Sequence, residues 1–114
     1  MAKTLDFNKV RRPVLSLIMQ DDAQTQINIC TPTERLVEEL QEALPELEPI
    51  LSSGDRNSIG VIYDLAARLI NCNRSFITVT PEELRGKYRM DLEMLLIFFG
   101  AYVDFINEIA NAKN

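Results

Sequence analysis

Apolar and polar residues alternate along two short segments near the N-terminus, residues 13–20 and residues 25–30. The apolar positions on one face are Leu15, Leu17, Met19, Ile27 and Ile29. Such alternation is typical of half-buried β-strands, and the polar residues 21–24 between the two segments favour a turn. We therefore predict a β-hairpin over residues 13–30, with one face in solvent and one face that a helical layer must cover.

The pattern changes to helical spacing after the hairpin. The motif Thr31-Pro32-Thr33-Glu34 is typical of a helix start, in which the Thr31 hydroxyl is expected to accept a hydrogen bond from the Glu34 amide. Leu36, Val37, Leu40 and Leu44 then follow on one face. We expect Pro45 to interrupt this helix, because proline lacks a backbone donor and clashes with the preceding turn.

A second helix is predicted from Ser58 to Cys72, where apolar residues recur at intervals of three and four. Asp55 or Asn57 is placed to cap its start, and Asn73 is placed to end it. The β-prone segment Phe76-Ile77-Thr78-Val79 is interpreted as a linker, the alternative being a third strand added to the hairpin.

Two further helices complete the chain. The motif Thr80-Pro81-Glu82-Glu83 repeats the capping chemistry of the first helix, and Gly86 is expected to end the short helix that it starts. Asp91 is placed to cap a last helix that runs from Leu92 to Ala110.

Together these elements predict one domain of the α+β class, mainly α, in which the N-terminal β-hairpin packs against a bundle of about four helices. A chain of 114 residues has the usual size of a single domain, here residues 1–114 with a helical part from 31 to 114. Residues 1–12 are polar, and we interpret their basic cluster, Lys9, Arg11 and Arg12, as the solubilising part of a flexible tail.

The last helix carries more apolar residues than one buried face needs. A first stripe consists of Leu92, Leu95, Leu96, Phe99, Tyr102, Val103, Ile106 and Ile109. A second stripe consists of Met94, Ile97, Phe98, Ala101 and Phe105. A helix that is apolar on every side is either central in its domain or presents one face to something outside it. We hypothesise that the second stripe binds a protein partner or a second copy of the chain, the alternative being that this helix is the core around which the others pack.

Composition and charge narrow the class of partner. The chain is 46% hydrophobic and 25% charged, as folded globular proteins are, and its net charge is −5 with an isoelectric point near 4.7. Binding of nucleic acid needs clustered Lys and Arg, so a nucleic-acid partner is not expected. The longest apolar run, Met94 to Val103, is about half of the roughly 20 residues that cross a bilayer, so we expect no membrane partner and a cytoplasmic location.

Residues suited to catalysis are scarce. The chain has no histidine, which removes the commonest proton shuttle and metal ligand. The densest carboxylates are Glu82, Glu83, Asp91 and Glu93, and we interpret them chiefly as acids that favour helix N-termini. We therefore predict that the chain is not an enzyme and has no cofactor and no metal site. A small metal-dependent enzyme that uses these carboxylates stays open as an alternative.

The two cysteines, Cys30 and Cys72, have neither CxxC spacing nor a neighbouring histidine. We interpret both as small buried apolar residues. In a reducing cytoplasm a disulfide between them is not expected.

The order of elements and three quoted segments resemble the tail assembly chaperones of long-tailed phages and prophages of Gram-positive bacteria. These segments are Ile29–Leu40 (ICTPTERLVEEL), Ile62–Asn71 (IYDLAARLIN) and Val79–Leu84 (VTPEEL), which follow the alternating strands. The resemblance covers the chain from Pro13 to Ile109.

This resemblance implies a small, mainly helical protein of the host cytoplasm that takes part in virion assembly. Such a protein binds the helical tape measure protein, keeps it soluble and helps to recruit subunits of the tail tube protein. A longer form made by translational frameshifting is common in the family, and self-association is compatible with it. The family supplies no catalytic motif. The alternative in this class is a small structural component of the tail or neck that forms a fixed oligomer.

Overall fold

The computed structural model describes residues 13–53 and 56–112. In chain order, the elements are β1 (Leu15–Ile18), β2 (Gln26–Ile29), α1 (Glu34–Ser53), α2 (Arg56–Asn71), α3 (Pro81–Arg85) and α4 (Leu92–Ala112). An antiparallel hairpin followed by four helices in the described ranges confirms the predicted α+β, mainly α fold. The tail expected over residues 1–12, with its basic cluster, lies outside the described residues.

The hairpin forms as its alternation predicts. β1 and β2 pair with Leu15 opposite Ile29 and Leu17 opposite Ile27, so these four side chains share the face toward the helices. Ile27 and Ile29 are fully buried there, and Leu15 and Leu17 are half-buried. On the opposite face the Ser16 hydroxyl donates to the side-chain oxygen of Asn28 at 2.7 Å. One face is therefore covered and the other polar.

The turn of the hairpin is held by one carboxylate. Asp21 accepts hydrogen bonds from the backbone amide of Thr25, at 2.8 Å, and from the Thr25 hydroxyl. The hydroxyl bond is the main reason why the pKa of Asp21 lies below its ordinary value. The Gln24 amide also donates to the Asp21 carbonyl at 2.9 Å, which closes the turn.

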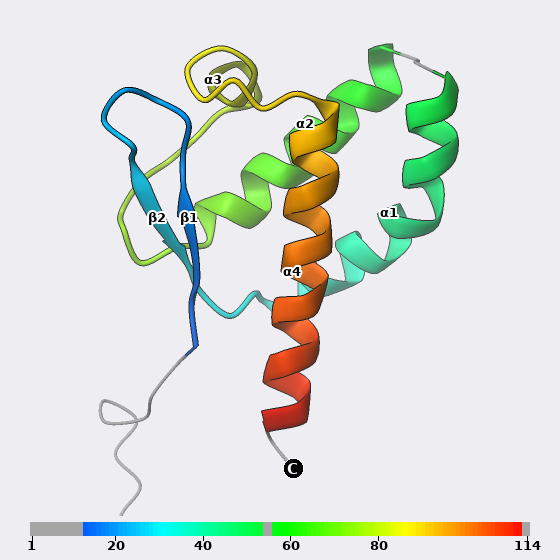
Figure 1. Ribbon diagram of the computed structural model, residues 1–114. Helices are drawn as coiled ribbons and strands as arrows, with labels where there is room; N and C mark the ends of the chain where they lie inside the picture. The colour runs from blue at the N-terminus through cyan, green and yellow to red at the C-terminus, as the bar shows by residue number, and fades with distance from the viewer. Residues whose placement is uncertain (1–12, 54–55, 113–114) are drawn as a thin grey trace, which may run out of the picture.

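Helix α2 occupies the centre of the fold. It packs against β2, α1, α3 and α4, and Figure 1 shows α4 crossing it, with α1 and the hairpin on opposite sides. Its buried face includes Ala66, Leu69 and Ile70, none of which has any exposed surface. The helix around which the others pack is thus α2 and not α4.

Helix α1 differs from the prediction at both its start and its middle. It begins at Glu34, and the Thr33 hydroxyl, not that of Thr31, accepts the hydrogen bond of its first turn, from the Leu36 amide at 3.2 Å. The expectation that Pro45 interrupts the helix is wrong, because α1 continues to Ser53. Pro45 lies on the exposed side, and Figure 1 shows α1 bending, which is how helices accommodate an internal proline.

The other predicted helix ends are confirmed where the structure describes them. Thr80 and Glu83 form a reciprocal capping box, with bonds of 3.1 and 3.2 Å between each side chain and the other residue's amide, and Gly86 ends α3. Asp91 caps α4 by accepting the Met94 amide at 2.9 Å. The side chain of Asn73 donates to the Ile70 carbonyl at the end of α2. The side chains of Asp55 and Asn57, expected to cap α2, are outside the described set.

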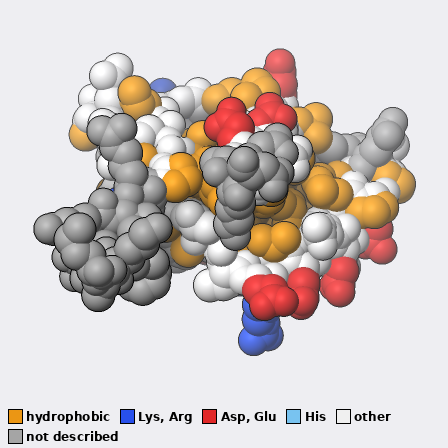
Figure 2. Space-filling model, turned by 90° about the horizontal axis from the view of Figure 1, so that it is seen from below, with side chains coloured by type: hydrophobic (Ala, Val, Ile, Leu, Met, Phe, Trp, Pro, Cys, Tyr) orange, Lys and Arg blue, Asp and Glu red, His pale blue; other side chains and the backbone are white. Residues whose placement is uncertain are grey.

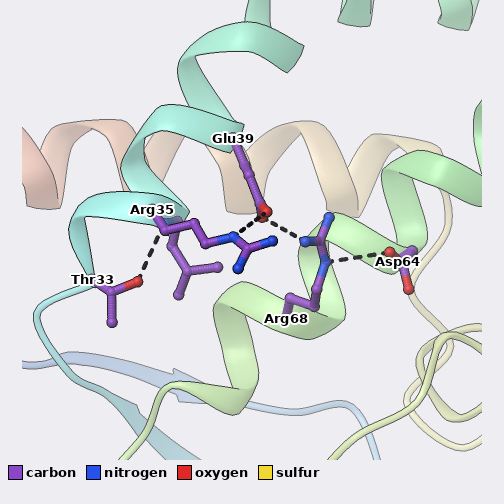
Figure 3. Close-up of polar contacts among 6 residues, drawn as sticks. Thr33, Arg35, Glu39, Asp64 and Arg68 are labelled. Carbon is purple, nitrogen blue, oxygen red and sulfur yellow. Dashed lines mark hydrogen bonds and ion pairs between the residues drawn. The ribbon is translucent and has the colours of Figure 1, made fainter.

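An ion-pair network connects α1 with α2, as Figure 3 shows. Glu39 on α1 contacts Arg68 on α2 at 2.5 Å and Arg35 one helical turn away at 3.5 Å. Arg68 also contacts Asp64 at 3.3 Å. Glu39 is 25% exposed, but its partners are at least 45% exposed and therefore screened by solvent, so each pair contributes on the order of 1 kcal/mol and the network mainly orients α1 on α2.

Candidate protein-binding groove

Helix α4 buries a different arc from either predicted stripe. Its five buried residues are Leu95, Phe98, Phe99, Tyr102 and Phe105, each 4% exposed or less. Neighbouring aromatic rings in this arc have centroids 5.5 to 6.3 Å apart, a favourable range for tilted aromatic pairs. The expectation that Phe98 and Phe105 face outward is therefore wrong. The first stripe also includes one exposed residue, Leu96, which is 48% exposed.

Four of the five residues of the second stripe nevertheless meet at one surface feature. Met94, Ile97, Phe98 and Ala101 line a groove between α4 and strand β1, whereas Phe105 does not. Residues 16–20 form the opposite wall, and Tyr88 and Met90 complete the lining. The groove has a volume of about 190 Å³. We call this feature the β1–α4 groove.

The turn before α4 sets the position of the groove. The amide side chain of Gln20, at the end of the β1 wall, lies 3.3 Å from the carbonyl oxygens of both Tyr88 and Arg89. The same turn is tied to α2, since the Tyr63 hydroxyl donates to the Met90 carbonyl at 2.6 Å. The hairpin and α4 are thus connected beside one end of the groove.

The β1 wall offers backbone groups as well as side chains. The Met19 amide donates to the Thr25 carbonyl at 2.9 Å, which marks the positions whose backbone faces β2. In an antiparallel pair the direction of these groups alternates, so the amide and carbonyl of Ser16 and Ile18 point away from β2. Within residues 13–53 and 56–112, β2 is the only strand that pairs with β1. On its outer edge, β1 is therefore not paired with any strand of the described residues.

The chemistry of the groove suits a protein segment better than a cofactor. No lining residue is charged, and the volume is below the roughly 300 Å³ at which pockets for small molecules begin. Two large aliphatic side chains of the groove remain in solvent, Ile18 at 69% and Ile97 at 59% exposed. Such residues are stabilised when the apolar side chains of another polypeptide cover them.

A second apolar hollow, of about 220 Å³, lies near the C-terminal end of α4. Its lining consists of Thr31, Pro32, Val37, Ile106, Ile109 and Ala110. Figure 2, seen from below, shows hydrophobic side chains gathered around this end of the molecule and acidic side chains along one margin. The first stripe of α4 therefore also reaches the surface.

Phe76 is a prominent residue that the periodic pattern of apolar positions does not indicate. Its side chain is 99% exposed, and its φ of 57° lies in the left-handed region, which is costly for a bulky residue. The surrounding loop is nonetheless well bonded, because the Asn73 side chain accepts the amides of Ser75 and Ile77 at 2.9 and 3.3 Å. The segment is a linker, as predicted, but it is one that holds an aromatic ring in solvent. No sequence pattern signals this, since the ring belongs to no periodic face.

Two of the four carboxylates considered for catalysis have structural roles. Glu83 and Asp91 are helix caps, as described above. In the described part of the chain no three side chains of His, Cys, Asp or Glu lie close enough together to hold a metal ion. The most perturbed ionisable group is Tyr102, whose pKa is raised by burial and, second, by the nearby Cys72.

Comparison of the chain with models of protein families, with curated proteins and with solved structures found no significant match in any of the three. Among the helices that the structure describes, none has the length and apolar character to cross a lipid bilayer.

Proposed function

We propose that this chain is an assembly chaperone that binds another polypeptide in the β1–α4 groove. The observation that carries the proposal is the uncharged groove with Ile18 and Ile97 left in solvent, beside a strand edge that pairs with no described strand. Exposed aliphatic residues grouped around a groove are a feature of protein-binding surfaces. Met94, Ile97 and Ala101 are the contact residues on α4, and Phe98 supports the floor from the core.

The kind of chaperone follows from the resemblance of residues 13–109 to tail assembly chaperones. On this proposal the partner in the groove is an apolar segment of the tape measure protein. Recruitment of the tail tube protein uses other surfaces, for which the hollow at the end of α4 and the Phe76 loop are candidates. The complex forms in the cytoplasm of the host cell.

The energetics are adequate for specific binding. Each square ångström of apolar surface removed from water contributes about 25 cal/mol, so covering Ile18, Ile97 and their neighbours contributes several kcal/mol before the cost of association. A charge placed in this contact would lose its hydration without gaining a partner. One charged substitution in the groove should therefore abolish most of the affinity.

A matched pair of substitutions on α4 tests the groove. Ile97→Asp places a carboxylate in the groove, whereas Leu96→Asp places one at an equally accessible position that does not line it. Each variant is co-expressed with a candidate tape measure protein, and the complexes are isolated on a tag carried by the partner. We expect Ile97→Asp to lower the affinity at least about tenfold, the effect of about 1.4 kcal/mol, and Leu96→Asp to bind normally.

Circular dichroism of the free variants must show unchanged helix content for the comparison to count. Equal binding by both variants would exclude the groove as the binding surface. Light scattering after size-exclusion chromatography addresses the competing structural role, because a tail or neck component would form one fixed oligomer in the absence of any partner.

A further inference from the structure

Two cysteines from distant parts of the sequence lie side by side in the fold. Cys30 follows β2, and Cys72 follows α2. The Cys30 amide donates to the Cys72 carbonyl at 2.9 Å, and the Arg74 amide donates to the Asn28 carbonyl at the same distance. These two bonds flank an antiparallel bridge between Ile29 and Asn73. Cys30 and Cys72 are therefore directly opposite each other.

This pairing gives the spacing that a disulfide needs. Opposite residues in an antiparallel pair have Cα atoms about 4.5 to 5.5 Å apart, within the roughly 4.4–6.8 Å of disulfides. Their side chains leave the backbone on the same side. In agreement, the Cys72 sulfur lies 3.8 Å from the carbonyl oxygen of Thr31, the residue after Cys30. Both thiols are free.

We propose that Cys30 and Cys72 form a reversible intramolecular disulfide, which acts as a redox-controlled staple between the hairpin and α2. The interpretation of both residues as buried is corrected by their partial exposure, which lets a small oxidant reach them. The staple closes a loop that contains the whole of α1 and α2, of which α2 packs against β2.

The chemistry requires an oxidant, and a low-molecular-weight disulfide such as oxidised glutathione supplies it. The Cys30 thiolate attacks one sulfur of this disulfide, whose S–S bond breaks and releases one small thiolate. Cys72 then loses its proton to solvent and attacks the Cys30 sulfur, releasing the second small thiolate. Overall two protein thiols lose two protons and two electrons, and the small disulfide gains them as two thiols.

The order of attack follows from the surroundings of Cys72. Its thiol lies within hydrogen-bonding distance of the Thr31 carbonyl, and burial raises its pKa, with the neighbouring Cys30 as the second cause. Both effects disfavour the thiolate of Cys72 as the first nucleophile. Because the bond is partly exposed, excess dithiothreitol should reduce it without unfolding of the protein.

The test uses the whole chain, incubated at low concentration with oxidised glutathione and then digested with trypsin without reduction. We expect one peptide pair joined between Cys30 and Cys72 and a protein mass lower by two hydrogen atoms. We also expect the melting temperature to rise by about 10 °C on oxidation and to return after dithiothreitol. Cys30→Ser and Cys72→Ser should each abolish both the cross-link and the shift.

Three outcomes would overturn the proposal. One is a chain whose two cysteines carry only glutathione, because then the thiols do not reach each other. The second is a cross-link between two chains. The third is a joined peptide pair whose formation requires urea, because the native positions would then be too far apart. Circular dichroism of the serine variants confirms that the loss of the cross-link is not due to unfolding.

Discussion

The Tyr63 hydroxyl donates a hydrogen bond to the backbone carbonyl of Met90 at 2.6 Å, and this bond ties the central helix α2 to the segment that leads into α4. Tyr63 is 6% exposed, and the Arg85 guanidinium lies 4.3 Å from the centre of its ring. The position of α4, and with it one wall of the β1–α4 groove, depends on this contact.

Tyr63→Phe should therefore destabilise the fold. The substitution keeps the ring and its contact with Arg85 but leaves the buried carbonyl of Met90 without its donor, which costs about 1–2 kcal/mol. Urea unfolding followed by circular dichroism measures the change. A variant as stable as the original chain would show that water replaces the lost hydroxyl.

Tyr102→Phe should have the opposite effect. Tyr102 has no exposed surface, and its hydroxyl has no hydrogen-bond partner within the described residues. Removing a buried hydroxyl that lacks a partner costs nothing or stabilises by about 1 kcal/mol. The same urea experiment compares the two tyrosines directly. A loss of stability in Tyr102→Phe would reveal an ordered water or another partner at the hydroxyl.

The stability of the fold at alkaline pH should depend on two buried tyrosines, Tyr63 and Tyr102. Burial raises the pKa of Tyr63 and that of Tyr102 above the ordinary value of 10.0. The folded state therefore keeps these hydroxyls protonated where the unfolded state releases their protons. Their contribution to stability is complete below pH 10.0 and is lost as the pH rises from there through the folded pKa values.

The loss of stability above pH 10.0 should be smaller in Tyr102→Phe than in the original chain. Urea titrations at neutral pH and above the tyrosine pKa provide the comparison. An identical alkaline loss in both proteins would mean that Tyr102 does not titrate differently in the two states.

The sequence predicted local structure well where a single physical signal acts. The alternation in residues 13–30 and the capping motif at Thr80 each admit one structure, and both appear as expected. Pro45 was misjudged because the cost of an internal proline is set by its position on the helix, and an exposed position with a bend lowers that cost. Position in the tertiary fold is not encoded in the local motif.

The arc that α4 buries could not be predicted for a related reason. Because α4 is apolar on nearly every side, periodicity is equally compatible with several arcs, and only packing against the rest of the fold selects one. Hence Phe98 is buried and Leu96 exposed, although the stripes suggested the reverse. Three residues of the second stripe, Met94, Ile97 and Ala101, nevertheless line the β1–α4 groove, because they border the selected arc.

Alanine substitutions test which residues of α4 this arc buries. Phe98→Ala removes a buried ring and should cost about 3–5 kcal/mol, whereas Leu96→Ala at an exposed position should change the stability by less than about 0.5 kcal/mol. Thermal unfolding monitored by circular dichroism measures both. The double variant Phe98→Asp with Phe105→Asp should not fold, in contrast to what the second stripe implied. Similar costs for Phe98→Ala and Leu96→Ala would contradict the arc described here.

The last prediction concerns Phe76. The strain of its backbone favours glycine at this position, whereas a role of its exposed ring in binding would favour phenylalanine. A non-glycine residue in the left-handed region costs about 1–2 kcal/mol, and the greater freedom of glycine in the unfolded chain costs about 0.5–1 kcal/mol. With φ at 57° and 99% of its surface exposed, Phe76 gains nothing inside this chain that offsets the strain. Phe76→Gly should therefore raise the free energy of unfolding by up to about 1 kcal/mol, and Phe76→Ala should leave it nearly unchanged.

If the strained ring is kept for binding, both variants should bind the partner more weakly despite folding at least as well, and normal binding by both would remove Phe76 from the binding surface.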